Sequence, residues 1–205
     1  MLKLYYAPGT CALASHIALE EAGAAYETVR LNFKNDDQKK PEYLKINPKA
    51  RVPALVTDRG IITETPALLI YIAQTHPAAK LAPLDDPFAL ARVQAFNSYL
   101  CSTAHVNHAH FTRGARWADD LSSLEDMKRK VPKNVGESFA LMESEMVEGP
   151  WVMGNAYTIC DPYLFTLAGW LTRDGVDIGR FPKIHDHHQR MGERAAVKKV
   201  LAAWS

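Results

Sequence analysis

The hydrophobic positions of the first part of the chain alternate between strand and helix spacing. An apolar run over residues 2–6 ends at Pro8-Gly9, and apolar positions then recur at helical spacing from residue 12 to Gly23. Residues 26–31 alternate and are partly β-branched, which is typical of a strand. A strand, a helix and a strand of these lengths predict two parallel strands joined by a right-handed crossover.

The pattern continues as a short helix, a hairpin and a further helix. Residues 33–40 are polar and predict a loop, and residues 41–46 predict a short helix. The apolar runs over residues 52–56 and 61–63 flank a glycine turn and predict a hairpin. Thr65-Pro66 then supplies a helix cap and a first helical residue, which gives the order β-α-β-α-β-β-α.

The rest of the chain has helical spacing throughout. The segment rich in proline and aspartate at residues 78–87 reads as a linker. It divides an α/β domain, residues 1–77, from an all-α domain, residues 88–205. The predicted helices of the second domain are residues 88–117, interrupted at Gly114; residues 124–147, capped by Ser123; and residues 162–171, 181–194 and 197–204.

Charge and composition limit which binding partners and which cellular compartment are expected. The 205 residues carry a net charge of +1 with no basic block, which argues against a nucleic-acid partner. The longest apolar run, residues 67–73, is far too short for a membrane span, and Met1 leads straight into a strand pattern without a signal peptide. Three scattered cysteines favour reduced thiols in the cytoplasm over a disulfide framework.

The first candidate for chemistry is Cys11. Thr10 stands where a helix cap is expected, so Cys11 falls in the first helical turn. Unpaired backbone N–H groups and the positive end of the helix dipole favour an anion there, and a thiolate is the reactive form of cysteine. The other interpretation is that Cys11 is a small buried apolar residue, and its position alone does not decide between the two.

Two histidine clusters and one capping motif complete the candidates. His105, His108 and His110 form one cluster, but no acid or cysteine stands at ligand spacing there, so no metal is expected. A second cluster is formed by His185, His187 and His188, and no metal is expected there either. Thr158 and Asp161 form a capping box, a structural motif whose loss costs about 1 kcal/mol.

Five motifs in this order together resemble the cytosolic glutathione transferases, and within them the bacterial beta class. They are Leu4-Tyr5-Tyr6-Ala7-Pro8-Gly9-Thr10-Cys11, Ile46-Asn47-Pro48-Lys49, Arg51-Val52-Pro53, Thr63-Glu64-Thr65 and Thr158-Ile159-Cys160-Asp161. The resemblance covers the whole chain. It implies a thioredoxin-like first domain that binds glutathione as co-substrate, a helical second domain that forms the cleft for a small hydrophobic electrophile, and a homodimer.

The resemblance also implies roles for residues of the first domain. Glu64 and Thr65 would hold the γ-glutamyl group of glutathione, whereas ordinary helix capping is the competing interpretation. Val52 would pair its backbone with the cysteinyl part if the Val52–Pro53 bond is cis, Pro53 having a structural role. Lys34 would bind a carboxylate of glutathione, although the loop length differs slightly and a solvated lysine is the alternative.

In the second domain the resemblance points to one helix. His105 matches the beta-class histidine that lies near the reactive thiol. The resemblance implies that this histidine donates a proton or polarises the thiol. Further glutathione contacts are implied for four residues before it, some across a dimer interface: Ser98, Ser102, Thr103 and Ala104. The sequence departs from the family at Ser98, often asparagine there, and at Val106, often charged, which weakens the expectation of contacts to a partner subunit.

The sequence therefore predicts a glutathione transferase that conjugates glutathione to small apolar electrophiles, with Cys11 and His105 as catalytic residues. Cys11 has no second cysteine at C-x-x-C spacing, so the first alternative is a monothiol, glutathione-linked disulfide reductase or peroxidase. The second alternative is a non-catalytic ligand-binding protein on the same fold.

Overall fold

A four-stranded sheet forms the first part of the structure, a computed structural model that describes residues 1–204. The strands are β1 (Leu2–Tyr6), β2 (Tyr26–Arg30), β3 (Ala54–Thr57) and β4 (Gly60–Thr63), in the order β2-β1-β3-β4. β1 pairs in parallel with β2, Leu4 lying opposite Thr28, whereas β3 is antiparallel to both β1 and β4. The predicted parallel pair and the predicted hairpin are both confirmed.

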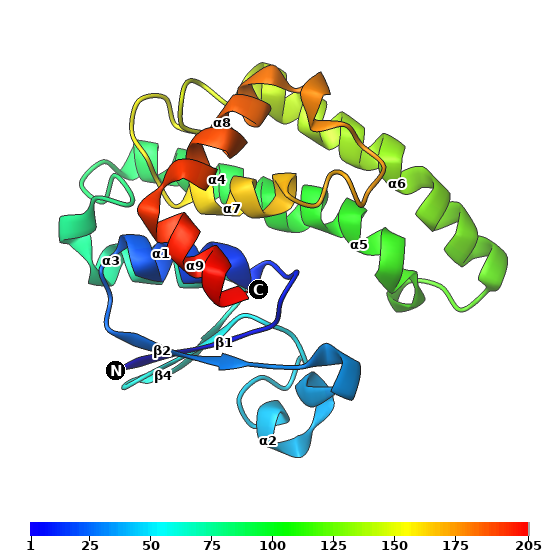
Figure 1. Ribbon diagram of the computed structural model, residues 1–205, viewed down its shortest axis with the longest axis horizontal. Helices are drawn as coiled ribbons and strands as arrows, with labels where there is room; N and C mark the ends of the chain where they lie inside the picture. The colour runs from blue at the N-terminus through cyan, green and yellow to red at the C-terminus, as the bar shows by residue number, and fades with distance from the viewer. Residues whose placement is uncertain (205) are drawn as a thin grey trace.

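Two helices cover the face of this sheet that looks toward the rest of the chain, α1 (Ala12–Glu21) and α3 (Thr65–Thr75), and the short α2 (Pro41–Leu44) lies beyond the opposite face (Figure 1). Glycines at positive φ, Gly9 at 71° and Gly23 at 63°, turn the chain before and after α1. Most of α1 is buried because it contacts α3 on its own domain and α7 and α9 of the second domain. Its small alanines allow these close contacts on several sides.

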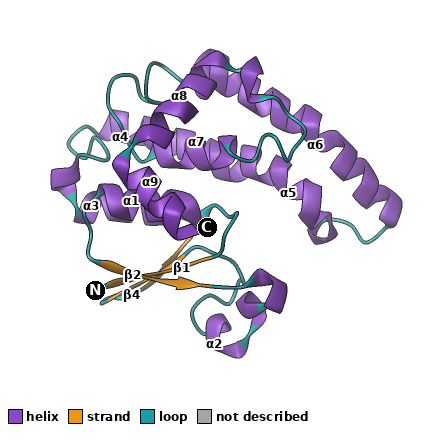
Figure 2. Cartoon of the chain, in the orientation of Figure 1, coloured by secondary structure: helices purple, strands orange, loops and turns teal. Residues whose placement is uncertain are grey.

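After the sheet the regular elements are helices and helical turns joined by loops (Figure 2), and one of these loops contains two isolated β-bridges, Trp151 with Gly154 and Met153 with Ala156. The elements are α4 (Pro87–Tyr99), the π-helical turn η4 (Leu100–Ala104), α5 (His105–Arg113), the 3-10 turn η5 (Gly114–Arg116), α6 (Leu121–Leu141), the π-helical turn η6 (Met142–Met146), α7 (Cys160–Ala168), α8 (Pro182–Glu193) and α9 (Ala195–Trp204). The predicted fold class, a thioredoxin-like domain followed by a helical one, is confirmed. The exact boundaries at residues 77 and 88 stay a prediction, and the last residue, Ser205, lies outside the described residues.

The structure corrects four local predictions. The loop at residues 33–40 contains two 3-10 turns, η1 (Phe33–Asn35) and η2 (Asp37–Lys39). Helix α6 begins earlier than expected because Asp120, not Ser123, caps it by accepting the N–H of Ser123 at 2.9 Å. Residue Glu64 rather than Thr65 occupies the cap position of α3. Helix α1 begins at Ala12, one residue later than predicted, although Thr10 makes the expected capping hydrogen bond by accepting the N–H of Ala12 at 3.4 Å. Over residues 1–204, no helix combines the length and the apolarity needed to cross a membrane.

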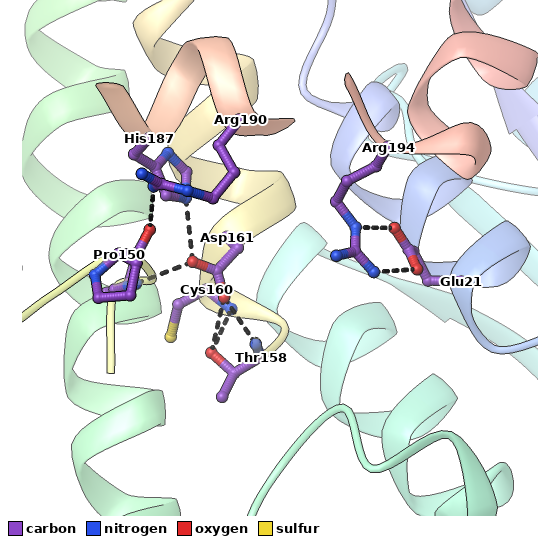
Figure 3. A network of polar contacts seen from close by, with 9 residues as sticks. Glu21, Pro150, Thr158, Cys160, Asp161, His187, Arg190 and Arg194 are labelled. Carbon is purple, nitrogen blue, oxygen red and sulfur yellow. Dashed lines mark hydrogen bonds and ion pairs between the residues drawn. The ribbon is translucent and has the colours of Figure 1, made fainter. Parts of the chain in front are cut away.

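The Thr158–Asp161 capping box lies at the start of α7, in the interior of the helical domain (Figure 3). The N–H of Cys160 donates to Thr158 Oγ1 at 3.3 Å, and the N–H of Thr158 donates to Asp161 Oδ2 at 2.6 Å. The same carboxylate also accepts the N–H of Val152 at 2.8 Å and lies 3.0 Å from Nε2 of His187. Asp161 therefore joins the start of α7 to the preceding loop and to α8, which extends its role beyond that of a helix cap.

The last helix fastens the helical domain to α1. Arg194, just before α9, makes a bidentate ion pair with Glu21 (Figure 3). Its Nε donates to Oε1 at 2.5 Å and its Nη2 to Oε2 at 2.7 Å. At the other end of α9, Trp204 Nε1 donates to His16 Nδ1 at 2.7 Å, and the indole packs 4.8 Å from the ring of Tyr6. Because Nδ1 accepts from Trp204, the ring proton of His16 lies on Nε2 and points to the hydroxyl of Tyr26, 3.1 Å away.

Acidification is expected to destabilise the fold through His16. Burial disfavours the charged imidazole and lowers its pKa from 6.5 to about 4. Between these two values the unfolded chain binds more protons than the folded one, so the stabilisation is complete above pH 6.5 and is lost as pH falls through 4. We expect a loss of roughly 2–3 kcal/mol in the free energy of unfolding, measured by urea titration across this range. A His16→Gln variant should show a flatter pH dependence, and an unchanged slope would contradict the assignment.

Candidate active site

A cavity of about 230 Å³ opens between the two domains. One wall comes from the loops that follow β1, precede β3 and precede α3, and the other comes from the face of α5 and its continuation η5, together with a residue of α7. Six of the residues predicted for the site line this cavity: Cys11, Val52, Pro53, Glu64, Thr65 and His105. They come from four separate segments of the sequence, so it is the fold that brings them together.

Cys11 lies at the start of α1 and lines the cavity. Its Sγ lies 3.7 Å from the carbonyl oxygen of Val52, to which the thiol donates, and the side chain is 8% exposed. Beside it, Thr10 Oγ1 accepts the N–H of Ala12 at 3.4 Å and donates to the carbonyl of Ala7 at 2.7 Å. The turn before α1 is therefore fixed by hydrogen bonds on both sides of the cysteine.

Burial decides the charge of this thiol. It raises the pKa of Cys11 above its ordinary value, and the hydrogen bond from Thr65 and the charge of Arg113 only partly oppose it. This corrects the expectation that the helix start would make Cys11 ionise more easily. In the ligand-free protein at neutral pH, Cys11 is a hydrogen-bond donor rather than a thiolate.

Glu64 and Thr65 line the cavity at the start of α3. Glu64 adopts φ 76°, a left-handed conformation that non-glycine residues seldom take, and it precedes the first turn of α3. Its carboxylate is paired with Lys49, whose ammonium also donates to Thr63 Oγ1 at 2.7 Å. The buried Thr65 lies between the helix start and the cavity, so a free N–H, a hydroxyl and a carboxylate lie close together there.

The peptide bond between Val52 and Pro53 is cis. The loop before it is anchored through the carbonyl of Arg51, which accepts hydrogen bonds from the hydroxyl of Tyr43 at 2.5 Å and from Nδ2 of Asn47 at 2.7 Å. These two hydrogen bonds fix the backbone at Arg51. Arg51 and the next residue, Val52, both line the cavity.

His105 is the first residue of α5 and follows the π-helical turn η4 directly. The extra residue of a π turn rotates everything after it by about 100°, and π turns are frequent at functional sites. Burial and the positive charges of Arg113, Arg116 and Arg51 lower the pKa of His105 to about 3. His105 is therefore neutral at physiological pH, which favours the thiol-polarising role over the proton-donor role expected from the sequence.

Ring contacts and hydrogen bonds within the helical domain hold His105 in place. Its ring packs 5.1 Å from that of Trp170, which in turn stacks 4.3 Å from the ring of His108. His108 Nδ1 lies 2.7 Å from the carboxylate of the buried Asp174, and Arg173 donates to Nε2 at 2.5 Å. Because arginine can only donate, the ring proton of His108 lies on Nδ1 and points to Asp174.

The structure places five other predicted residues outside the cavity. Lys34 is exposed in η1, where its neighbour Phe33 reaches the cavity instead. Ser98 on α4 is exposed, and the three residues of η4 do not line the cavity either: Ser102, Thr103 and Ala104. Within one chain, their predicted contacts to glutathione therefore have no support from the geometry.

Other lining residues were not among the predicted site residues. Cys101, Tyr163 and Trp117 reach the cavity from the helical side, and Arg51, Arg113 and Arg116 bring three guanidinium groups. A signal was present for part of this set, because residues 105, 109, 113 and 116 recur at helical spacing and share one face. Over residues 1–204, no three histidine, cysteine or acidic side chains gather as metal ligands.

Comparison with known proteins agrees with this geometry. The family model described as Glutathione S-transferase, N-terminal domain matches residues 1–74, and that described as Glutathione S-transferase, C-terminal domain matches residues 92–195. Glutathione S-transferase GstA of Escherichia coli O157:H7 is 30% identical over 98% of each chain. A crystal structure of a glutathione transferase homolog from Sulfitobacter with bound glutathione is 46% identical, with a TM-score of 0.96 over 99% of this chain and 98% of that chain. The bacterial beta class glutathione S-transferase of Sphingomonas chungbukensis is 30% identical, with a TM-score of 0.86 over 99% and 98%.

The similar proteins are not all named for the same reaction. Disulfide-bond oxidoreductase YfcG of Escherichia coli K12 is 24% identical over 98% of this chain and 94% of its own. The residues of the cavity therefore decide between conjugation and disulfide chemistry.

Proposed function

The chain belongs to the glutathione S-transferase family, and on that premise we propose that it binds glutathione in the cavity between its domains and conjugates it to small apolar electrophiles. The observation that carries the proposal is that Cys11, Val52, Thr65 and His105 line one space. Glutathione needs, in sequence, an anion site, an extended backbone partner and a site for its sulfur. These residues offer all three within the one cavity.

The γ-glutamyl end fits the start of α3. A carboxylate there meets the N–H of Thr65, its hydroxyl and the positive end of the helix dipole. The ammonium group meets the carboxylate of Glu64, one oxygen of which is already bound by Lys49. Glutathione would therefore share this carboxylate with Lys49, and the extended cysteinyl part would continue toward Val52 and Cys11.

The sulfur of glutathione would end beside Cys11 and His105. A protonated Cys11 can turn its S–H from the Val52 carbonyl to a glutathione thiolate, and a neutral His105 can offer a ring N–H. Both donors stabilise the thiolate, which attacks an electrophilic carbon while the leaving group departs with its electron pair. In this scheme Cys11 assists the nucleophile and is not itself consumed.

A second candidate reaction is glutathione-linked disulfide reduction, in which Cys11 forms a mixed disulfide. The observation that favours it is that a cysteine stands at the site of the sulfur, and the raised pKa of its thiol is the observation against it. The non-catalytic alternative predicts uptake of glutathione without turnover. Assignment to the beta class, a homodimer and a cytoplasmic location remain parts of this proposal.

Calorimetric titration with glutathione tests the first step. Wild type should bind the tripeptide, and Thr65→Ala should weaken its affinity by about tenfold or more because a buried hydroxyl donor at the anion site is lost. Thr75→Ala is the matched control, since that hydroxyl lies at the other end of α3 and bonds to the carbonyl of Tyr71. No heat of binding with wild type would refute the proposed function, and equal affinities of the two variants would refute the placement.

A further inference from the structure

Three arginine side chains line the active-site cavity without an acidic partner. Arg51 precedes Val52, Arg113 ends α5 and Arg116 lies in η5. Among residues 1–204, none of the three guanidinium groups makes an ion pair or a hydrogen bond, whereas other arginines do, such as Arg92 with Glu148 and Arg194 with Glu21. The one acid lining the cavity, Glu64, is already held by Lys49.

The three charges act on one another and on the same neighbour. Arg113 is half-buried and is repelled by Arg51, and Arg116 is repelled by both. All three also disfavour a positive charge on His105, which shows that they converge on its side of the cavity. Gathering like charges in a partly buried hollow is unfavourable unless an anion occupies it. The ligand-free cavity therefore attracts negative charge beyond what one carboxylate needs.

Glutathione accounts for only part of this charge. One of its two carboxylates goes to the start of α3 in the function proposed above. Arg51 adjoins Val52, so it lies where the glycyl end of a chain paired with Val52 would reach, and it can take the second. Arg113 and Arg116 are then left without an anion, on the helical wall beside Trp117 and Val106.

We propose that the second substrate is an electrophile with an apolar body and a carboxylate, and that Arg113 and Arg116 bind this carboxylate. The inference rests on the proposed function and narrows its substrate class. The planar guanidinium fork suits a carboxylate with two parallel hydrogen bonds. Trp117, 48% exposed, and Phe33, 36% exposed, offer apolar surface on opposite walls for the body of the substrate.

A matched pair of aryl chlorides tests this charge preference, 4-chloro-3,5-dinitrobenzoate and its methyl ester. In both, the glutathione thiolate adds to the carbon that carries chlorine, the C–S bond forms, the C–Cl bond breaks and chloride leaves with the bonding pair. The thiol proton passes to solvent. The quantity measured is the ratio of kcat/KM for the acid to that for the ester, each corrected for its uncatalysed rate with glutathione.

Wild type should prefer the acid, and Arg113→Gln/Arg116→Gln should lower the acid-to-ester ratio by about tenfold or more, mainly through the KM of the acid. Arg129→Gln removes one positive charge, as Arg116→Gln does, but from an exposed position on α6, and it should leave the ratio unchanged. Because Arg116 is exposed, Arg116→Gln alone serves if the double variant does not fold, and it should lower the ratio in the same direction.

Three results would overturn the proposal. The wild-type ratio could lie at or below one, the double variant could keep the wild-type ratio, or it could instead lose affinity for glutathione in calorimetry. The last result would mean that the arginines serve the tripeptide. Failure of the proposed function itself looks different, because wild type would then bind no glutathione and convert neither chloride.

Discussion

A Cys11→Ala variant is expected to lose all glutathione-dependent disulfide reduction but to retain conjugation at a rate about tenfold below that of wild type. Reduction needs a sulfur at position 11 that can form and release a mixed disulfide. Conjugation needs only a hydrogen-bond donor near the glutathione thiolate, and loss of one such donor to a charged acceptor costs about 1.5 kcal/mol, or about tenfold. Steady-state rates with a halogenated nitrobenzene and with a mixed disulfide measure the two reactions separately.

Cys11→Ser separates the donor from the nucleophile. A serine hydroxyl still donates but forms no disulfide, so this variant should conjugate faster than Cys11→Ala and reduce no disulfide. If both variants lose conjugation completely, Cys11 has a covalent role in that reaction and the scheme is wrong. If disulfide reduction survives in both, another thiol is responsible, and Cys101 is the cysteine that also lines the cavity.

Replacing Asp161 by alanine should lower the free energy of unfolding by about 3–5 kcal/mol, the largest stability effect expected for a polar residue in this chain. The carboxylate is completely buried and accepts from the backbone of Val152 and Thr158 and lies 3.0 Å from Nε2 of the equally buried His187. Truncation leaves these groups without an acceptor in a site that water does not reach. Urea unfolding of the two proteins at neutral pH measures the difference.

Two variants check that burial is the cause. Asp161→Asn keeps the volume and one acceptor oxygen, so it should lie between wild type and Asp161→Ala. Asp177→Ala removes an exposed carboxylate that accepts one N–H, from Gly179 at 2.9 Å, and should cost about 1 kcal/mol or less. Equal losses in Asp161→Ala and Asp177→Ala would contradict the account.

The elements that the sequence predicted are those whose ends are marked by local chemistry. Pro8-Gly9 and Gly23 delimit α1, and the Gly60 turn marks the hairpin, because these residues act through their own backbone. Where two candidate caps stand close together the prediction was wrong, as with Ser123, because Asp120 accepts hydrogen bonds from that residue. The π turn before His105 has no sequence signature and was missed.

The sequence predicted which residues line the site better than it predicted their protonation states. The residues that line the cavity near Cys11 could be named because each belongs to a motif with its own spacing. The raised pKa of Cys11 and the lowered pKa of His105 could not be predicted, because both follow from burial by segments distant in sequence. Lys34 was predicted to bind a carboxylate of glutathione, but it does not line the cavity, because loop length in the sequence does not say which side chain faces inward.

The contact between Trp204 and His16 has a consequence for biosynthesis. The thioredoxin-like domain leaves the ribosome first, but one side of α1 stays uncovered until α9 has also emerged and docked. A nascent chain that stops before Arg194 leaves Tyr6 and His16 without Trp204 and lacks the partner of Glu21 that ties the two domains together. We therefore expect docking of α9, rather than completion of the sheet, to be the step at which the cleft acquires its final shape.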